Sequence, residues 1–359
     1  MTTDTPTPSP TLNDEATPKL STLDRLLPVW IGSAMVGGIL LGRLIPDLND
    51  TLDKVKVDTV SLPIAIGLLA MMYPVLAKVR YRGISAELGD RRTMGLSLVL
   101  NWVVGPALMF TLAWVFLGDL PELRTGLIIV GLARCIAMVL IWNDLACGNS
   151  ELGAVLVAVN SVFQIVMYTV LGWFYLDLLP GWLGLETQSL DVGMWPIAKS
   201  VLIFLGIPLV AGFLTRTILE ARKGTDWYEH SFLPRIGPIA LYGLLFTIVV
   251  LFSLQGDQIL DRPLDVARVA VPLLIYFTLM WFGSFGAGYR LGLPYDRNTS
   301  VAFTAAGNNF ELGIAVAIAV FGVTSGQALA GTIGPLIEVP VLVGLVYVAL
   351  WAKRRWYGE

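Results

Sequence analysis

The chain has 359 residues, of which 55% are hydrophobic and 14% are charged, and its mean hydropathy is +0.72. A soluble domain of this length would carry about 25% charged residues, so the composition excludes an ordinary water-soluble protein. The net charge of −3 indicates no nucleic-acid partner. Apolar runs of about 20 residues predict membrane-spanning segments and not a large soluble core.

Residues 1–25 are rich in Thr and Pro and lack the apolar region of a signal peptide, so we expect a disordered tail. Ten apolar windows of about 20 residues follow, each long enough to cross a bilayer as a helix. The windows are 26–46, 60–79, 94–118, 123–147, 152–178, 196–219, 234–255, 267–291, 298–322 and 326–352. They divide into a first five-helix half (26–179) and a second (195–352), followed by a basic cytoplasmic tail (353–359).

Lys and Arg are distributed unequally between the two sides of these segments. With the N-terminus inside, sixteen lie in inner segments, seven lie in outer segments and Arg134 lies within a span, which accounts for all 24. Because cytoplasmic loops carry an excess of Lys and Arg, we expect both termini in the cytoplasm.

A faint internal repeat relates the two halves. Residues 63–69 resemble residues 238–245 at an offset of 175, with one residue inserted. The same offset carries Cys135 onto Phe310, next to Glu311. Because each half has an odd number of spans, the halves must have opposite topology. The sequence therefore predicts an all-α integral membrane protein built from two inverted five-helix repeats.

Glu311 lies in the middle of the ninth segment, where a charged side chain costs about 2.5 to 3.5 kcal/mol on insertion scales. Gly307, Asn308 and Asn309 precede it and are poor helix formers. We therefore expect the helix to unwind there and to expose backbone polar groups. The two amides can either bind a polar solute or satisfy this backbone. A broken span with an acid at the midplane is typical of the binding site of a secondary transporter.

Arg134 and Cys135 are adjacent near the centre of the fourth segment. Most buried cysteines are small packing residues, but a neighbouring arginine favours the thiolate, and Cys135 maps next to Glu311 in the repeat. We therefore expect Cys135 to have a functional role. Arg134 either contacts the solute or forms a salt bridge with Glu311 or Glu338, because a buried guanidinium needs a partner or a wet cavity. Glu338, in a proline-kinked part of the tenth segment, is either a proton relay or the counter-charge of Arg134.

Weaker candidates lie on the fourth and fifth segments. Asn143 and Asp144, near the inner end of the fourth segment, are expected to line a cytoplasmic vestibule. Asn160 and Gln164 share one face of the fifth segment and extend this set.

Cys147 follows Cys135 by twelve residues, which is about 18 Å along a continuous helix, so the two thiols could not bind one small centre. Cys147 is therefore interpreted as a bystander. The sequence contains no nucleotide-binding loop and no other enzyme signature. We accordingly expect no enzymatic activity and no cofactor, with an ion gradient as the source of energy.

Five motifs occur in order along the chain: ARCIAMV at 133–139, WNDLACGN at 142–149, AVLVAVNSVFQ at 154–164, NNFEL at 308–312 and GPLIEVPV at 334–341. Together they resemble the arsenite efflux permeases of the bile acid/arsenite/riboflavin transporter superfamily. The likeness covers all ten segments and leaves out the N-terminal tail. One departure is Asn149, where the family often has Asp.

The resemblance implies ten helices in two inverted repeats, divided into a panel domain and a core domain in which the broken fourth and ninth helices cross. It implies export of arsenite, and sometimes antimonite, across the plasma membrane by proton antiport. The family's essential cysteine falls on Cys135, where As(III) would bind, and its ninth-span glutamate falls on Glu311. The sequence is compatible with an oligomer.

The chemistry of the residues agrees with this implication. A soft thiolate selects a soft centre such as As(III), and a single thiol can release it again. Asn308, Asn309 and Glu311 could form hydrogen bonds to the arsenic hydroxyls. We expect proton coupling to involve Glu311, Glu338 and Arg134.

Two other functions remain open at this point. A sodium-coupled importer of organic anions on the same fold would need an oxygen-lined cation site and a roomier pocket, and no thiol. A membrane receptor or enzyme that transports nothing would require a sizeable domain outside the membrane.

Overall fold

The computed structural model describes residues 26–45, 56–57, 60–79, 90–136, 138–185 and 194–358, so the predicted tail 1–25 lies outside the described residues. The helices are α2 (Leu27–Leu44), α4 (Leu62–Ala77), α6 (Arg91–Val99), α7 (Gly105–Leu117), α8 (Pro121–Leu132), α9 (Met138–Leu145), α10 (Ser150–Trp173), α11 (Leu179–Trp182), α12 (Met194–Val201), α13 (Ile207–Lys223), α14 (Thr225–Trp227), α15 (Leu233–Asp261), α16 (Pro263–Arg290), α17 (Tyr295–Ala306), α18 (Phe310–Phe321) and α19 (Gly326–Ala352). The described part also contains one short antiparallel strand pair, β1 (Lys56–Val57) and β2 (Val60–Ser61), which adds to the predicted all-helical fold.

Five-residue π-helical turns join several of these helices into longer rods. The turns are η2 (Leu100–Val104), η3 (Phe174–Leu178), η4 (Leu202–Gly206), η5 (Tyr228–Phe232) and η6 (Lys353–Tyr357). A proline stands two residues after the end of the first four turns, at positions 106, 180, 208 and 234. Proline lacks an N–H and its ring collides with the carbonyl four residues earlier. The wider π turn accommodates this carbonyl without ending the helix.

Six helices in the described part are long and apolar enough to cross a membrane: Arg91–Leu117, Ser150–Trp182, Met194–Lys223, Thr225–Gly256, Pro263–Arg290 and Gly326–Tyr357. Three shorter apolar helices, Val29–Leu44, Leu62–Ala77 and Phe310–Phe321, correspond to further predicted segments. The predicted segments 123–147 and 298–322 are each divided into two half-helices, α8 with α9 and α17 with α18.

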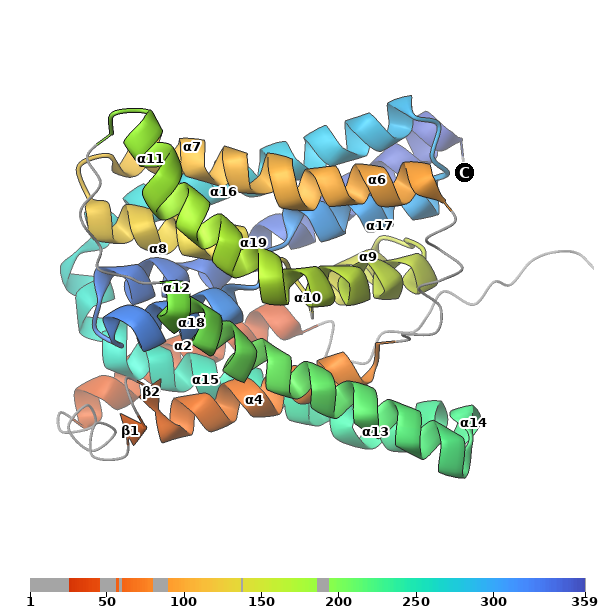
Figure 1. Cartoon of the computed structure of the whole chain (residues 1–359), viewed down its shortest axis with the longest axis horizontal. Coiled ribbons are helices and arrows are strands. Elements are labelled where there is room, and N and C mark those ends of the chain that lie inside the picture. The colour runs from red at the N-terminus through yellow and green to blue at the C-terminus, as the bar shows by residue number, and fades with distance from the viewer. Residues whose placement is uncertain are drawn as a thin grey trace, which may run out of the picture.

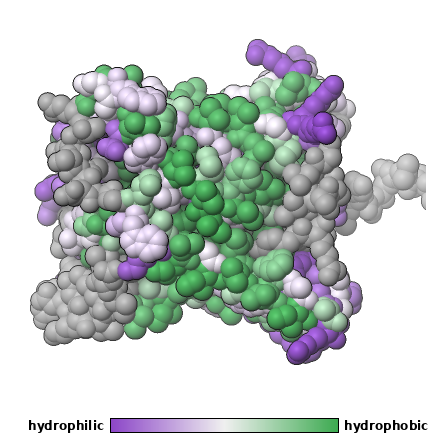
Figure 2. All heavy atoms as spheres, viewed as in Figure 1, coloured by the Kyte–Doolittle hydropathy of each residue, from purple (hydrophilic) through white to green (hydrophobic). Residues whose placement is uncertain are grey.

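The surface carries a wide apolar band. Large apolar side chains such as Val115, Trp195 and Tyr347 are each 70% exposed. Figure 2 shows hydrophobic residues across the middle of the molecule and hydrophilic residues toward both ends. An exposed apolar surface of this extent would be unstable in water but suits the hydrocarbon of a bilayer. The chain is therefore a multi-pass membrane protein.

The helices pack into two groups (Figure 1). In the four-helix group, α15 packs against α2 and α4, and α4 packs against α13. In the crossing group, α8 packs against α7, α18 and α19, while α17 packs against α16 and α9. Glycines permit the close approach of α8, α18 and α19, because a Cβ atom at Gly313 would lie 3.0 Å from Val130 and one at Gly331 would lie 2.7 Å from Ile314. Small residues at helix contacts are the usual means of tight packing in membranes.

Candidate functional site

The two interrupted helices meet at their interruptions. The N–H of Cys135 donates to the carbonyl of Gly307 at 3.3 Å, and the N–H of Asn309 donates to the carbonyl of Ala133 at 3.0 Å. Arg134 and Asn308 thus lie opposite each other as an antiparallel bridge. Each break leaves helix-end N–H and C=O groups without helical partners, and the two breaks satisfy some of these groups for each other. The unwinding predicted at Gly307–Asn309 is confirmed.

The first break was not predicted from its own residues, because Ala, Cys and Ile carry no helix-breaking signal. The estimate of about 18 Å between Cys135 and Cys147 assumed a continuous helix. That assumption is wrong, since α8 ends at Leu132 and α9 begins at Met138. The backbone turns instead because it pairs with the second break.

In each break, one side-chain oxygen accepts a hydrogen bond from the central N–H. The N–H of Arg134 donates to Oε1 of Gln164, and the N–H of Asn308 donates to Oε1 of Glu338 at 3.4 Å. Each acceptor stands 30 residues after its donor, so the two pairs occupy equivalent positions in the two halves of the chain. Gln164 therefore lies beside the break in mid-segment, and not near a helix end with Asn143 and Asp144.

Cys135 is 3% exposed and lies against Gly307. A Cβ atom at position 307 would lie 2.9 Å from Cβ of Cys135 and 3.5 Å from Oε1 of Glu338. Cβ of Cys135 and the Glu338 carboxyl therefore both approach the space that a side chain at position 307 would occupy. Only glycine leaves that space open.

Glu311 lies in the first turn of α18 and is 5% exposed. It lines a cavity of about 10 Å³ between the two helix groups, together with Thr247 and Leu251 of α15 and Thr332 of α19. This volume holds about one water molecule. Glu311 thus faces the boundary across which the four-helix group and the crossing group contact each other.

Arg134 is fully buried, and its guanidinium is only partly satisfied. Nη1 donates to the hydroxyl of Tyr276 at 2.8 Å, which donates to Oδ1 of Asn308 at 3.3 Å. Nε and Nη2 have no hydrogen-bond partner among the residues that the structure describes. Within the described residues, Arg134 forms no ion pair with Glu311 or Glu338, so the salt bridge considered from the sequence is not formed. A buried charge without a counter-ion costs several kcal/mol, about 3 to 5 when a partner is removed.

The crossing presents more unpaired donors than acceptors. Unpartnered buried donor atoms are Nδ2 of Asn308, Nδ2 of Asn309 and Nε2 of Gln164, in addition to the two Arg134 nitrogens. The unpartnered acceptor beside them is Oε2 of Glu338. Buried polar groups are normally paired, so such a cluster indicates a place for a small polar ligand. Oδ1 of Asn309 is used locally, because it accepts the N–H of Leu312 and caps α18.

Tyr276 is the site residue that sequence reasoning missed. It comes from α16, which belongs to neither interrupted helix, and its hydroxyl contacts side chains of both breaks. A tyrosine in an aromatic-rich apolar segment has no distinguishing signal in the sequence. Its role depends on an approach of helices that are distant in the chain.

The other candidates make contacts within the scaffold. Asn143 is buried and accepts a hydrogen bond from Ser300 at 2.9 Å. Asp144 accepts one from Ser150 at 2.7 Å, near the end of α9. Asn160 is buried and accepts a hydrogen bond from the indole of Trp102 at 3.2 Å. The vestibule role of these residues stays a prediction.

An ion pair connects the first turn of the half-helix α17 to the start of α6. Arg297 donates to Asp90, the N-cap residue of α6, at 2.9 Å. The Thr93 hydroxyl donates to the same carboxyl at 2.6 Å and holds the pKa of Asp90 below its ordinary value. Asp90 therefore remains ionised near neutral pH and keeps its ion pair with Arg297.

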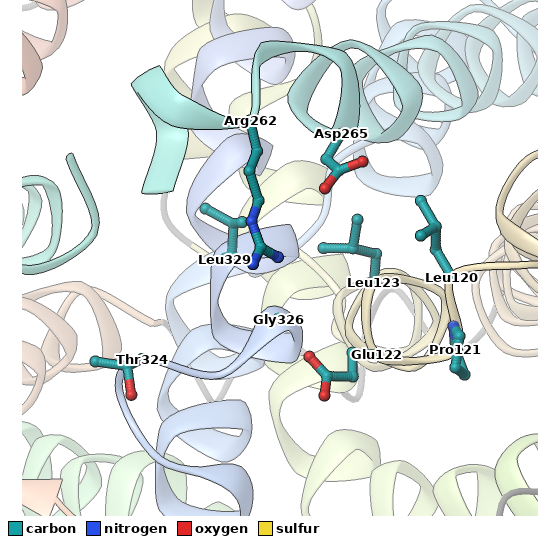
Figure 3. Close-up of a pocket in the computed structure, with 9 residues that line it drawn as sticks. All are labelled: Leu120, Pro121, Glu122, Leu123, Arg262, Asp265, Thr324, Gly326 and Leu329. Carbon is teal, nitrogen blue, oxygen red and sulfur yellow. The ribbon is translucent and has the colours of Figure 1, made fainter. Parts of the chain in front are cut away.

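A larger cavity, of about 460 Å³, opens where α8, α16 and α19 begin. Its charged side chains are Glu122, Arg262 and Asp265, and Figure 3 shows Arg262 reaching toward Leu329 of α19. Gly326 allows Glu122 to approach the start of α19, since a Cβ atom there would lie 2.6 Å from the carboxylate. Sequence reasoning did not single out this cavity, because charged residues near helix starts are common at membrane surfaces.

The chain is similar in sequence to known transport proteins. A family model described as the Sodium Bile acid symporter family matches residues 65–262. The arsenical-resistance protein Acr3 of Corynebacterium glutamicum is 61% identical, over 93% of this chain and 90% of that protein. An uncharacterized transporter of Synechocystis sp. is 37% identical, over 93% of this chain and 91% of that protein. The arsenical-resistance protein Acr3 of Alkaliphilus metalliredigens is 32% identical, over 94% of each.

Proposed function

Because this chain belongs to the Sodium Bile acid symporter family, and within it to the arsenical-resistance proteins, we propose that it exports arsenite from the cytoplasm in exchange for protons. Members of these families are transporters, and the chain is not an enzyme. The observation that carries the proposal is the crossing of the two breaks, where Cβ of Cys135 and the Glu338 carboxyl flank Gly307 and Arg134 pairs with Asn308.

Cys135 supplies the ligand for arsenic. Arsenite near neutral pH is mostly the uncharged trihydroxide, and As(III) is a soft, thiophilic centre. The thiol sulfur bonds to arsenic, one arsenic hydroxyl leaves, and the thiol proton joins it to form water. Arsenic remains trivalent throughout, so no oxidant or reductant is required. Since one thiol forms one such bond, the reverse reaction with water releases the solute.

The remaining oxygens of the solute match the unpaired donors of the crossing. Nε and Nη2 of Arg134 and the amides of Asn308 and Asn309 can donate to arsenic-bound oxygens. This supports a direct solute contact for Arg134. Antimonite has the same shape and thiophilicity, and we include it as a second solute.

Proton coupling is assigned to Glu311 and Glu338. Protons from outside and arsenite from inside compete for the crossing, so loading one releases the other. The four-helix group would act as the panel and the crossing group as the core, and rocking between them would open the site to each side in turn. The position of Glu311 at the boundary between the groups supports this assignment.

The ten-span inverted repeat is supported by equivalent positions in the two halves. The N–H donors at positions 134 and 308 have their acceptors at positions 164 and 338, so donor and acceptor have the same spacing in both halves. Five spans per half, in opposite topology, place both termini on one side. Figure 1 shows α14, the start of α6 and the C-terminus at the same end of the molecule. This end carries the basic segments around Arg91, Lys223 and Arg355, which supports a cytoplasmic location in a plasma membrane.

With this orientation, the 460 Å³ cavity opens to the outside. We assign it as the exit vestibule. The solute would pass through it after leaving the crossing, between the starts of α8 and α19.

Transport by everted membrane vesicles tests the proposal. Vesicles that contain the chain should accumulate arsenite when an imposed pH gradient is present, without sodium, and a protonophore should abolish the accumulation. In liposomes, arsenite movement should drive protons in the opposite direction. Accumulation that requires sodium, or that ignores the protonophore, would contradict proton antiport.

The second candidate is a sodium-coupled symporter of organic anions, which the family description suggests. The 61% identity to an arsenical-resistance protein favours arsenite. Sodium-dependent uptake of an organic anion by the same vesicles would support the second candidate. If the protein transports nothing, Glu311→Gln should leave arsenite flux unchanged.

A further inference from the structure

The Arg134 guanidinium is held by two helices that contain neither break. Nη1 of Arg134 donates to the hydroxyl of Tyr276 on α16 at 2.8 Å. A Cβ atom at Gly105, the first residue of α7, would lie 2.6 Å from Nη1 and 3.2 Å from that hydroxyl. Gly105 and Tyr276 thus form a guanidinium socket that receives one nitrogen of Arg134.

The socket determines where the rest of the guanidinium points. The group is planar and its N–H directions are fixed relative to one another, so holding Nη1 restricts Nε and Nη2 as well. Both of these nitrogens are buried and have no partner in the described part of the chain. The same Tyr276 hydroxyl donates to Oδ1 of Asn308 and so fixes the orientation of this amide. Nδ2 of Asn308 then points away from Tyr276 and has no partner among the described residues. One hydroxyl therefore orients donors from both breaks.

We propose that Gly105 and Tyr276 are positioning residues that set the affinity for the solute. They hold Arg134 and Asn308 so that three nitrogen atoms donate to the two oxygens that remain on arsenic after the Cys135 thiol has replaced one hydroxyl. The inference rests on the proposed export of arsenite and deepens it, because it names the atoms that recognise the oxygens and the residues that orient those atoms.

Tyr276→Phe tests the socket by removing only the hydroxyl. Losing a hydrogen bond to a charged group should weaken solute binding about tenfold. We expect the KM for arsenite to rise about tenfold while the maximal rate stays within about twofold, the pattern for a lost binding contact. The measurement is arsenite transport by everted vesicles over a range of concentrations, normalised to the amount of protein in the membrane.

Tyr168→Phe is the matched control. Tyr168 is also buried, and its hydroxyl donates to the carbonyl of Ile129 in α8 at 2.9 Å. This substitution removes a hydrogen bond of the same kind from the same group of helices, but it leaves the contacts of Nη1 and Asn308 intact. Its KM should stay close to that of the wild type.

Gly105→Ala tests the other wall of the socket. The added methyl group would displace Nη1, so we expect the KM to rise as in Tyr276→Phe. Gly283→Ala and Gly286→Ala are the controls, since nothing lies within 4 Å of a Cβ atom at either position. Alanine favours helix over glycine, so a defect confined to Gly105→Ala would come from the clash.

The outcomes separate the inference from the function on which it rests. If Tyr276→Phe exports arsenite with an unchanged KM, the inference is overturned and arsenite export stands. The inference is also overturned if Tyr276→Phe lowers the maximal rate and the amount of protein without changing the KM, because that pattern indicates a structural role. A wild-type chain that exports no arsenite overturns both.

Discussion

The break that contains Arg134 and Cys135 and the break at 307–309 share a backbone arrangement and differ in their side chains. In each, the central N–H is accepted by a side-chain oxygen 30 residues later, from Gln164 in the first and from Glu338 in the second. The first break carries Arg134 and Cys135, whereas the second carries two amides and is followed by Glu311. The same backbone arrangement can thus hold a soft ligand and a cation in the first break and proton-binding groups in and beside the second.

Each half-helix that follows a break is succeeded by a residue with a positive φ. Cys147, after α9, has a φ of +54°, and Gly322, after α18, has a φ of +94°. Gly322 follows Cys147 by the same offset that relates 63–69 to 238–245, so a positive φ after the half-helix occurs in both halves, although Gly322 combines it with an extended ψ of 160°. Here too the first half has a cysteine where the second half has another residue type.

Cys135→Ser should have the largest effect, because it removes the soft ligand from the first break and keeps a group of similar size. A hydroxyl is a hard ligand with little preference for As(III). We expect arsenite export to fall to background and expressing cells to lose arsenite resistance. Growth on arsenite and vesicle transport measure the loss.

Cys147→Ser is the control for this prediction. Cys147 lies at the end of α9, away from the paired breaks, and its substitution should leave transport near the wild-type level. If Cys135→Ser cells resist arsenite as well as wild-type cells do, the thiol is not the ligand. The assignment of the soft ligand to the first break and of the proton-binding groups to the second is then wrong.

Glu338→Gln makes the second break resemble the first, where the corresponding residue is Gln164. The amide oxygen can still accept the N–H of Asn308, so the fold should persist. The amide does not titrate, so we expect vesicles to lose arsenite accumulation driven by a pH gradient. Exchange of labelled for unlabelled arsenite, which requires no net proton movement, should continue. Accumulation equal to that of the wild type would show that Glu338 does not take part in proton coupling.

Gly307→Ala should have a smaller effect, confined to the contact between the breaks. Gly307 has φ −70° and ψ 144°, which alanine adopts easily, so the backbone itself is not strained. The new methyl group would lie 2.9 Å from Cβ of Cys135 and must displace it. Overpacking of this kind costs about 1 to 3 kcal/mol, and we expect a weaker arsenite affinity with a lowered melting temperature.

Gly344→Ala serves as the comparison, because a Cβ atom at Gly344 meets nothing within 4 Å. Its affinity and melting temperature should match those of the wild type. An unchanged affinity in Gly307→Ala would mean that the close approach of Cys135 and Gly307 is not needed for binding.

The two breaks also show what the sequence can and cannot predict. The second was predicted from Gly307 and the two asparagines, whose low helix propensity is a local property. The first has ordinary helix-forming neighbours, and only the family resemblance implied it. Its turn depends on pairing with a segment in the other half of the chain, which no local pattern records. For the same reason Tyr276 and the socket at Gly105 could not be found before the helices were placed.

The smallest effect is expected for Cys147→Gly, which places after α9 the residue type that stands after α18. The N–H of Gly148 donates to the carbonyl of Asn143 and that of Cys147 to the carbonyl of Asp144, the helix-ending pattern in which glycine usually takes the left-handed position. A side chain costs about 1 to 2 kcal/mol in that conformation, and glycine's greater entropy loss offsets about 0.5 to 1 kcal/mol of the relief. Cys147→Gly should therefore unfold slightly later than Cys147→Ala in a thermal scan of the purified protein, with transport unchanged. A lower melting temperature for Cys147→Gly than for Cys147→Ala would show instead that position 147 carries no backbone strain that glycine relieves.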